Sequence, residues 1–238
     1  MTHLEQELQN LKNDTIEMMN LVLNQFQKTQ VALVDFNLDI VREVKHLEKR
    51  VDAFELKISM DCENALALFN PVAIDLRFIL AVLKMVTSVE RLGDYAKSMT
   101  STIGKFQRPV NQELLDKTQV KKMFEICSKM LGCVQVAFDT DNSNLARQPL
   151  SLDDELDAIN DSAEPVLVQW MKDHPDDIEN ALHLLLIIRR LERFGDQVKN
   201  IAHEIIFHHE AKMLKHHKKQ IKNIKDGLGR ETEGGVAP

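Results

Sequence analysis

The fold is decided by DLRFILAVLKMVTSVERLGDYAKSMT at residues 75–100 and by its copy, DIENALHLLLIIRRLERFGDQVKNIA at residues 177–202. The two stretches align without gaps, and every aligned pair has the same offset, as in Asp94 with Asp196. Apolar residues recur in both copies at the spacing of one helix face, which predicts a long amphipathic helix at each position. A repeat of this length indicates that one helical unit occurs twice along the chain.

Turn-forming residues are scarce, because the 238 residues include only eight Gly and six Pro, while 44% of the chain is apolar. This composition favours a few long helices with short connections over a sheet. The periodicity predicts helices at residues 3–44, 45–68 and 72–103, then at 112–145, 151–172 and 176 to beyond 207. Ser151 is the predicted N-cap of the fifth helix, and Pro165 is expected to kink that helix.

We therefore expect an all-α protein made of two tandem, pseudo-symmetric three-helix bundles. The first bundle is predicted to span residues 1–108 and the second residues 109–212. Residues 213–238 form a basic and then Gly-rich tail, which is expected to be disordered.

Several features predict a soluble, cytoplasmic protein. Three cysteines, at positions 62, 127 and 133, show neither a pairing pattern nor a zinc-site spacing, which is typical of thiols in a reducing compartment. The polar N-terminus does not resemble a signal peptide, and the longest apolar run, residues 181–188, is too short to cross a bilayer. The net charge of -7 argues against nucleic acid as a partner, since nucleic-acid binders usually present a basic face.

Two carboxylates on the third helix, Glu90 and Asp94, are spaced one helical turn apart. The turn at Asn70 folds the second helix back along the third. Glu48 and Asp52 precede that turn by about as many residues as Glu90 and Asp94 follow it. Four carboxylates are therefore predicted at one height of the hairpin.

The second copy predicts the same arrangement. Its turn at His174 brings Asp153 and Asp157 level with Glu192 and Asp196. Four negative charges this close repel one another unless a cation lies among them. Sites made only of carboxylates suit ions such as Mg²⁺, Ca²⁺, Mn²⁺ or iron, so each hairpin is a candidate metal site.

The alternative is a surface network of ion pairs, in which Arg50, Arg91, Arg193 and nearby lysines neutralise the carboxylates. Gly93 and Gly195 lie within the same motif, in mid-helix, where Gly costs about 1 kcal/mol relative to Ala. We expect these glycines to allow close contact between helices, in preference to leaving room for a ligand beside the carboxylates.

The sequence resembles the PhoU family at ERLGD (90–94) and ERFGD (192–196), at the acidic segments 48–52 and 153–157, and at Asp75-Leu76-Arg77. The resemblance extends from the first helix to about residue 210. Asp177 matches Asp75 in the second copy, but Glu179 stands where the first copy has Arg77. Tyr95 and Gln197 replace the His or Arg that many members carry after the motif.

The resemblance implies a negative regulator of phosphate uptake and of phosphate-starvation signalling. Such a protein acts between a phosphate ABC transporter and a membrane sensor histidine kinase, and commonly forms a homodimer. The resemblance also implies divalent or trivalent metal ions, singly or in multinuclear clusters, at the acidic motifs. Iron, zinc, manganese and magnesium are the candidates.

No Gly-rich phosphate loop, HExxH motif or nucleophile elbow occurs in the sequence, and we therefore expect no enzymatic activity. Two alternatives stay open. A metal-dependent phosphohydrolase would use a carboxylate cluster to activate water. A helical scaffold without metal would use the repeats only for contacts.

Residues 208–225 carry six lysines and four histidines against one glutamate, a local positive stretch in an acidic chain. The simplest interpretation is a solvated helix end, where the lysines also interact favourably with the negative C-terminal end of the helix dipole. The alternative is a contact with an acidic partner or with anionic lipid at a membrane surface.

Overall fold

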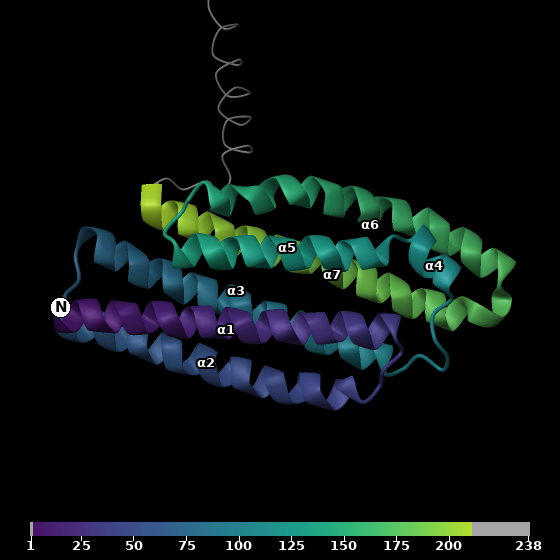
Figure 1. Cartoon of the computed structure of the whole chain (residues 1–238), viewed down its shortest axis with the longest axis horizontal. Coiled ribbons are helices and arrows are strands. Elements are labelled where there is room, and N and C mark those ends of the chain that lie inside the picture. The colour runs from purple at the N-terminus through teal and green to yellow at the C-terminus, as the bar shows by residue number, and fades with distance from the viewer. Residues whose placement is uncertain (1, 211–238) are drawn as a thin grey trace, which may run out of the picture.

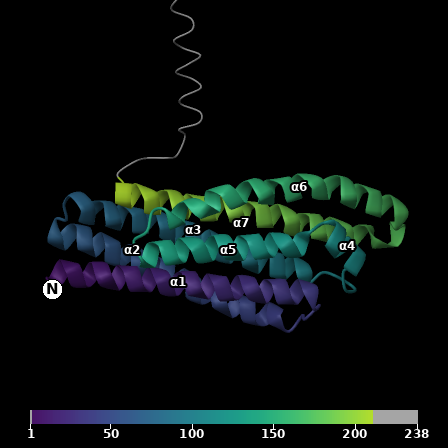
Figure 2. The ribbon, with the colours of Figure 1, turned by 45° about the horizontal axis from the view of Figure 1, so that its top comes forward.

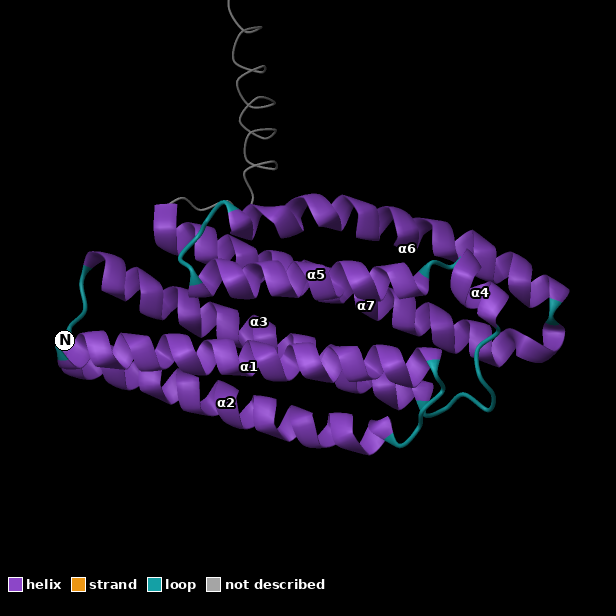
Figure 3. Cartoon of the chain, in the orientation of Figure 1, coloured by secondary structure: helices purple, strands orange, loops and turns teal. Residues whose placement is uncertain are grey.

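The computed structural model describes residues 2–210, which form seven α-helices, two short 3-10 helices and no strand (Figure 3). The predicted tail, residues 213–238, and all but the start of the basic stretch lie outside the described residues. The helices are α1 (His3–Val34), α2 (Ile40–Phe69), α3 (Ala73–Ile103), α4 (Gln112–Lys117), α5 (Val120–Asp139), η1 (Leu145–Arg147), α6 (Gln148–Asp173), η2 (Pro175–Asp177) and α7 (Ile178–Glu210).

Helices α1, α2 and α3 form one antiparallel bundle, and α5, α6 and α7 form the other (Figures 1 and 2). The two bundles meet where α3 packs along α7, which runs in the opposite direction, and where α1 packs along α5. The predicted fold class, two tandem three-helix bundles, is confirmed. No helix within residues 2–210 is both long and apolar enough to cross a bilayer.

The prediction of one helix over residues 3–44 was wrong. The chain turns at residues 35–39, between α1 and α2, where Phe36 adopts a left-handed conformation with φ of 50°. The side chain of Asn37 accepts a hydrogen bond from the backbone N–H of Asp39 at 3.2 Å. Asn and Asp make such local bonds and favour turns, so this turn forms without Gly or Pro.

The predicted helix over residues 112–145 is also interrupted and ends early. Gln119 has a φ of 52° and separates α4 from α5, and α5 ends at Asp139. Asp141 has a φ of 51°, and the side chain of Asn142 accepts hydrogen bonds from the backbone N–H groups of residues 144 and 145. Polar side chains again form the turn that a search for Gly and Pro missed.

Helix α6 begins three residues before the predicted N-cap. Its first turn contains Pro149, which has no N–H to leave unpaired at that position. The hydroxyl of Ser151 donates to the carbonyl of Gln148, so Ser151 lies inside the helix and does not cap it. Pro165 lies within α6, as expected, and the helix is bowed in Figure 1.

Buried apolar side chains from both bundles form one continuous hydrophobic core. Phe26 of α1 stacks on Phe194 of α7 with ring centroids 4.1 Å apart, and contacts Phe124 of α5 at 5.0 Å. Phe78 of α3 stacks on Phe138 of α5 at 5.9 Å. Aromatic pairs of this kind contribute about 0.5–1.5 kcal/mol beyond their buried area. The two repeats are thus held together by core packing.

Both motif glycines allow close contact between helices. A Cβ atom at Gly93 would lie 3.2 Å from Gln25 Oε1 and 3.3 Å from Val51 Cγ1. At Gly195 the added atom would overlap Cδ2 of Leu156, which is fully buried. Close packing, the favoured interpretation of these glycines, accounts for their place in mid-helix.

We predict that Gly195→Ala lowers the free energy of unfolding by about 1–3 kcal/mol, because Leu156 must shift within a filled core. Gly93→Ala is the matched control. A Cβ atom at position 93 meets its neighbours less closely than one at position 195. The higher helix propensity of Ala, about 1 kcal/mol relative to Gly, therefore offsets the cost of these contacts. Urea denaturation of both variants measures the difference. Equal losses of stability would contradict this account of Gly195.

Candidate functional site

The four carboxylates of the first copy lie together on α2 and α3. We call Glu48, Asp52, Glu90 and Asp94 the first patch. The ammonium of Lys97 donates a hydrogen bond to Glu48 and lies 3.9 Å from Oδ1 of Asp94. Glu48 is only 8% exposed, so Lys97 and not water is its main polar partner.

Burial and mutual repulsion make the first patch hard to ionise fully. Burial, the charge of Asp94 and a hydrogen bond with Asp94 raise the pKa of Glu90 to about 7, and Asp52 adds to the shift. Burial and the charge of Glu48 likewise raise the pKa of Asp52. Carboxylates act on one another in this way only when they are close. The structure thus brings the predicted four together.

The second patch consists of Asp153, Asp157, Glu192 and Asp196, on α6 and α7. The ammonium of Lys199 donates a hydrogen bond to Asp153 and lies 2.7 Å from Oδ1 of Asp196. Burial raises the pKa of Glu192, and the charges of Asp196 and Asp157 raise it further. The second predicted quartet is therefore also assembled.

Asp153 is the most constrained carboxylate of the second patch. It is 6% exposed, and its Oδ2 bonds to Lys199, but its Oδ1 has no hydrogen-bond partner among the described residues. Burial raises the pKa of Asp153, although the Lys199 ammonium opposes that shift. A buried oxygen without a partner costs about 1–3 kcal/mol, so this atom is a good acceptor for an additional cation or donor.

The donor chemistry of both patches fits a hard metal ion, since only carboxylate oxygens are offered. As placed, however, no three His, Cys, Asp or Glu side chains within residues 2–210 are arranged to hold one. Lys97 and Lys199 supply the positive charge in this arrangement. Binding of an ion would require each lysine to move away from its carboxylates. Metal binding by these eight residues stays a prediction.

The sequence alternative of nearby lysines that neutralise the carboxylates did not name these two, although a signal was present. Lys97 and Lys199 occupy equivalent positions of the two copies, three residues after Asp94 and Asp196. Residues three apart on a helix are neighbours, so each lysine could have been paired with its aspartate. What spacing could not show is the second contact of each lysine, to a carboxylate on the neighbouring helix.

The remaining motif residues lie elsewhere. Arg91 and Arg193 are exposed on α3 and α7. Asp75 borders a cavity of about 490 Å³ at one end of the molecule, together with His208 of α7. The Nε atom of Arg77 is buried and has no hydrogen-bond partner among the described residues.

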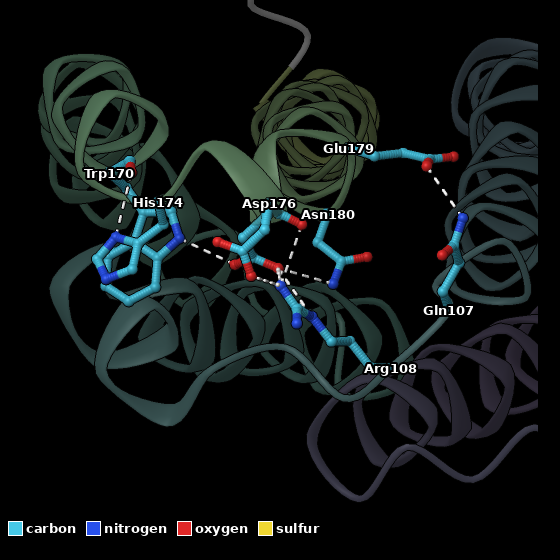
Figure 4. Close-up of polar contacts among 8 residues, drawn as sticks. Gln107, Arg108, Trp170, His174, Asp176, Glu179 and Asn180 are labelled. Carbon is cyan, nitrogen blue, oxygen red and sulfur yellow. Dashed lines mark hydrogen bonds and ion pairs between the residues drawn. The ribbon is translucent and has the colours of Figure 1, made fainter.

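Asp177, the counterpart of Asp75, is the last residue of η2, just before α7, and belongs to a different cluster, of which Figure 4 labels Arg108 and Trp170. It is 6% exposed and accepts hydrogen bonds from Trp170 Nε1 at 2.9 Å and from Asn180 at 3.0 Å. Arg108, in the connection between the repeats, donates to Asp177 at 3.0 Å and to Asp176 at 2.9 Å. These bonds fix the connection to the second bundle, a role that no local pattern indicated.

Comparisons with known proteins agree on one family. The sequence model of the PhoU domain matches this chain twice, at residues 15–103 and 120–205. Two similar proteins, from Deinococcus radiodurans and Aquifex aeolicus, are both named phosphate-specific transport system accessory protein PhoU homolog. The first is 28% identical over 85% of this chain and 94% of its own length, and the second is 29% identical over 90% and 96%.

Solved structures show the same fold. The crystal structure of PhoU from Pseudomonas aeruginosa superposes with a TM-score of 0.82 at 26% identity, covering 87% of this chain and 99% of that one. The phosphate transport system regulatory protein PhoU from Streptococcus pneumoniae gives a TM-score of 0.80 at 23% identity, covering 90% and 100%.

The raised pKa of Glu90 predicts a dependence of stability on pH in metal-free buffer. The folded protein keeps the proton up to about pH 7, whereas the unfolded chain releases it near the ordinary value of 4.5. The folded state is therefore favoured below 4.5, and this contribution is lost as the pH rises to about 7. Glu90→Gln should remove that part of the pH dependence.

Urea denaturation at several pH values, with a chelator present, measures the effect. The variant should gain stability relative to the wild type as the pH rises through this window. Glu63→Gln, which removes one charge from an exposed position further along α2, is the control and should leave the pH profile unchanged. Parallel profiles for wild type and Glu90→Gln would contradict the proximity of Glu90 to Asp94.

Proposed function

Because the chain belongs to the PhoU family, we propose that it regulates phosphate uptake through contacts with other proteins and has no catalytic activity of its own. The observation that carries the proposal is the match of the PhoU domain to both repeats, which together make up most of the described chain. The names of the similar proteins, accessory protein and regulatory protein, support a regulatory role.

We further propose that the partners are a phosphate ABC transporter and a membrane sensor histidine kinase, and that the protein acts as a cytoplasmic homodimer that dampens the starvation response. The similar proteins are named as accessories of a phosphate-specific transport system, which supports the first partner. The long helices leave apolar side chains exposed for such contacts. On α7 these are Ile178, Leu182 and Leu186, each at least 40% exposed and spaced along one face.

The two patches are proposed as cation sites that support this role. Their residues would hold an ion through carboxylate oxygens, and the unpartnered Oδ1 of Asp153 is the atom that most favours one. A bound cation would relieve the repulsion that raises the pKa values of Glu90 and Glu192. Lys97 and Lys199 would balance the charge of the patches in the absence of metal.

Deletion of the gene in the organism that encodes the chain should activate phosphate-starvation genes in phosphate-rich medium. A reporter fused to a starvation promoter measures the effect, and expression of the full-length chain should reverse it. In phosphate-poor medium the reporter is already active, so deletion should change little there. An unchanged reporter in rich medium would place the protein in another pathway.

Metal content tests the patches independently of signalling. Replacing Glu90 by Gln and Asp94 by Asn should lower the bound metal by about half, because the two patches are separate sites. Elemental analysis of gently purified protein gives the ratio of metal to chain. The matched double variant, Asp157→Asn with Glu192→Gln, should lose the other half. Unchanged metal in both variants, or none in the wild type, would remove these residues as ligands.

A further inference from the structure

A cavity of about 510 Å³ lies between α3 and α7, next to the first patch. Arg190 and Arg193 border it on the α7 side, and Tyr95, Ser98 and Ser101 border it on the α3 side. The two arginines also border a second cavity, of about 630 Å³, whose lining residues all belong to α7 and include Glu192 and Asp196. The cavity between the helices, which we call the inter-repeat cavity, therefore joins residues of both copies.

Among the described residues, neither arginine of the inter-repeat cavity has a carboxylate partner. Within residues 2–210, neither guanidinium lies within 4.0 Å of a carboxylate, although the charge of Arg193 acts on the Glu192 carboxyl next to it. The neighbouring Arg189 behaves differently, because its Nη2 pairs with Glu164 at 2.7 Å. Arg190 donates only to the backbone carbonyl of Leu186, at 3.2 Å.

The two guanidinium groups repel each other. Arg190 and Arg193 are three residues apart on α7, which makes them neighbours on the helix surface beside the same cavity. Like charges held together in this way are stabilised by an anion placed between them. Arginine is also well suited to an oxyanion, since its planar group donates paired hydrogen bonds to phosphate oxygens.

The α3 side of the cavity offers neutral donors. Within the described chain, the hydroxyls of Tyr95, Ser98 and Ser101 make no hydrogen bond to another residue. Lys97 also borders the cavity, but its ammonium is bonded to Glu48. Asp94 is the one acid among the described residues that border the cavity, and its repulsion favours an anion bound on the arginine side.

We propose that the inter-repeat cavity binds a phosphate-type oxyanion, held by Arg190 and Arg193 and by hydroxyls of α3. The oxyanion is either free orthophosphate or the phosphate of a lipid headgroup, since both present the same oxygens to these donors. The proposal does not rest on the regulatory role or on metal binding, and its test uses purified protein only.

The repeat provides a matched control. At the positions equivalent to Arg190 and Arg193, the first copy has Ser88 and Arg91. The pair of arginines is therefore specific to the second copy, while Arg91 is exposed and does not border the cavity. Arg91→Gln removes one positive charge at the equivalent place without touching the proposed site.

Orthophosphate is the first probe. Titration calorimetry of the full-length chain in about 0.15 M salt, where interactions between exposed charges are screened, should show saturable binding. The double variant Arg190→Gln, Arg193→Gln should bind at least about tenfold more weakly, whereas Arg91→Gln should stay within about twofold of the wild type. Circular dichroism of each variant checks that the helices are intact.

Vesicles of phosphatidylcholine with phosphatidylglycerol are the second probe. Association that is lost in the double variant, with no heat from orthophosphate, would support the site and identify the lipid headgroup as its source. If orthophosphate displaces the protein from the vesicles, free phosphate binds in the inter-repeat cavity as well. Binding of neither probe by the wild type, or equal binding by the wild type and the double variant, would overturn the proposal.

Discussion

The antiparallel packing of α3 against α7 is the constraint on which the rest of the structure depends. Both helices are long, both bury apolar side chains along most of their length, and each carries one copy of the repeated motif. Phe194 of α7 stacks on Phe26 of α1, and Lys84 of α3 pairs with the buried Glu204 of α7 at 3.2 Å. The two helices form the interface between the bundles. The way they pack therefore determines where the carboxylates of the repeated motif and the inter-repeat cavity lie.

Charge balance is the second determinant of the site. Eight carboxylates gather in two patches, and each patch receives one lysine from the helix that carries its motif. The patches are not identical. Lys199 contacts carboxylates on both helices closely, whereas Lys97 lies 3.9 Å from Asp94, and the pKa of Glu90 is raised to about 7. The charges of the first patch are therefore less closely paired by lysine than those of the second, whereas the second patch holds the buried, unpartnered oxygen of Asp153.

The repeats share a backbone plan but differ in their surfaces. The second copy has Arg190 where the first has Ser88. Its Asp177 accepts hydrogen bonds from Trp170 and Arg108. Each bundle therefore presents its own chemistry on a common scaffold. Family membership and fold thus explain the core that the two repeats share. Residues that differ between the repeats give each bundle a different surface.

The sequence by itself determined the repeat, the all-α class, the tandem bundles and the pairing of acidic segments across each hairpin. These features follow from local hydrophobic periodicity and from the number of residues between each acidic segment and its turn, and both can be read from the order of residues alone. The turn at Phe36 was missed because it contains no Gly or Pro and is marked only by a local hydrogen bond from the backbone N–H of Asp39 to the side chain of Asn37. Only the tertiary structure decided how each helix is rotated about its axis. That rotation placed Lys97 and Lys199 among the carboxylates, joined Arg108 to Asp177 and left Arg190 and Arg193 beside a cavity, since such contacts link residues far apart in sequence.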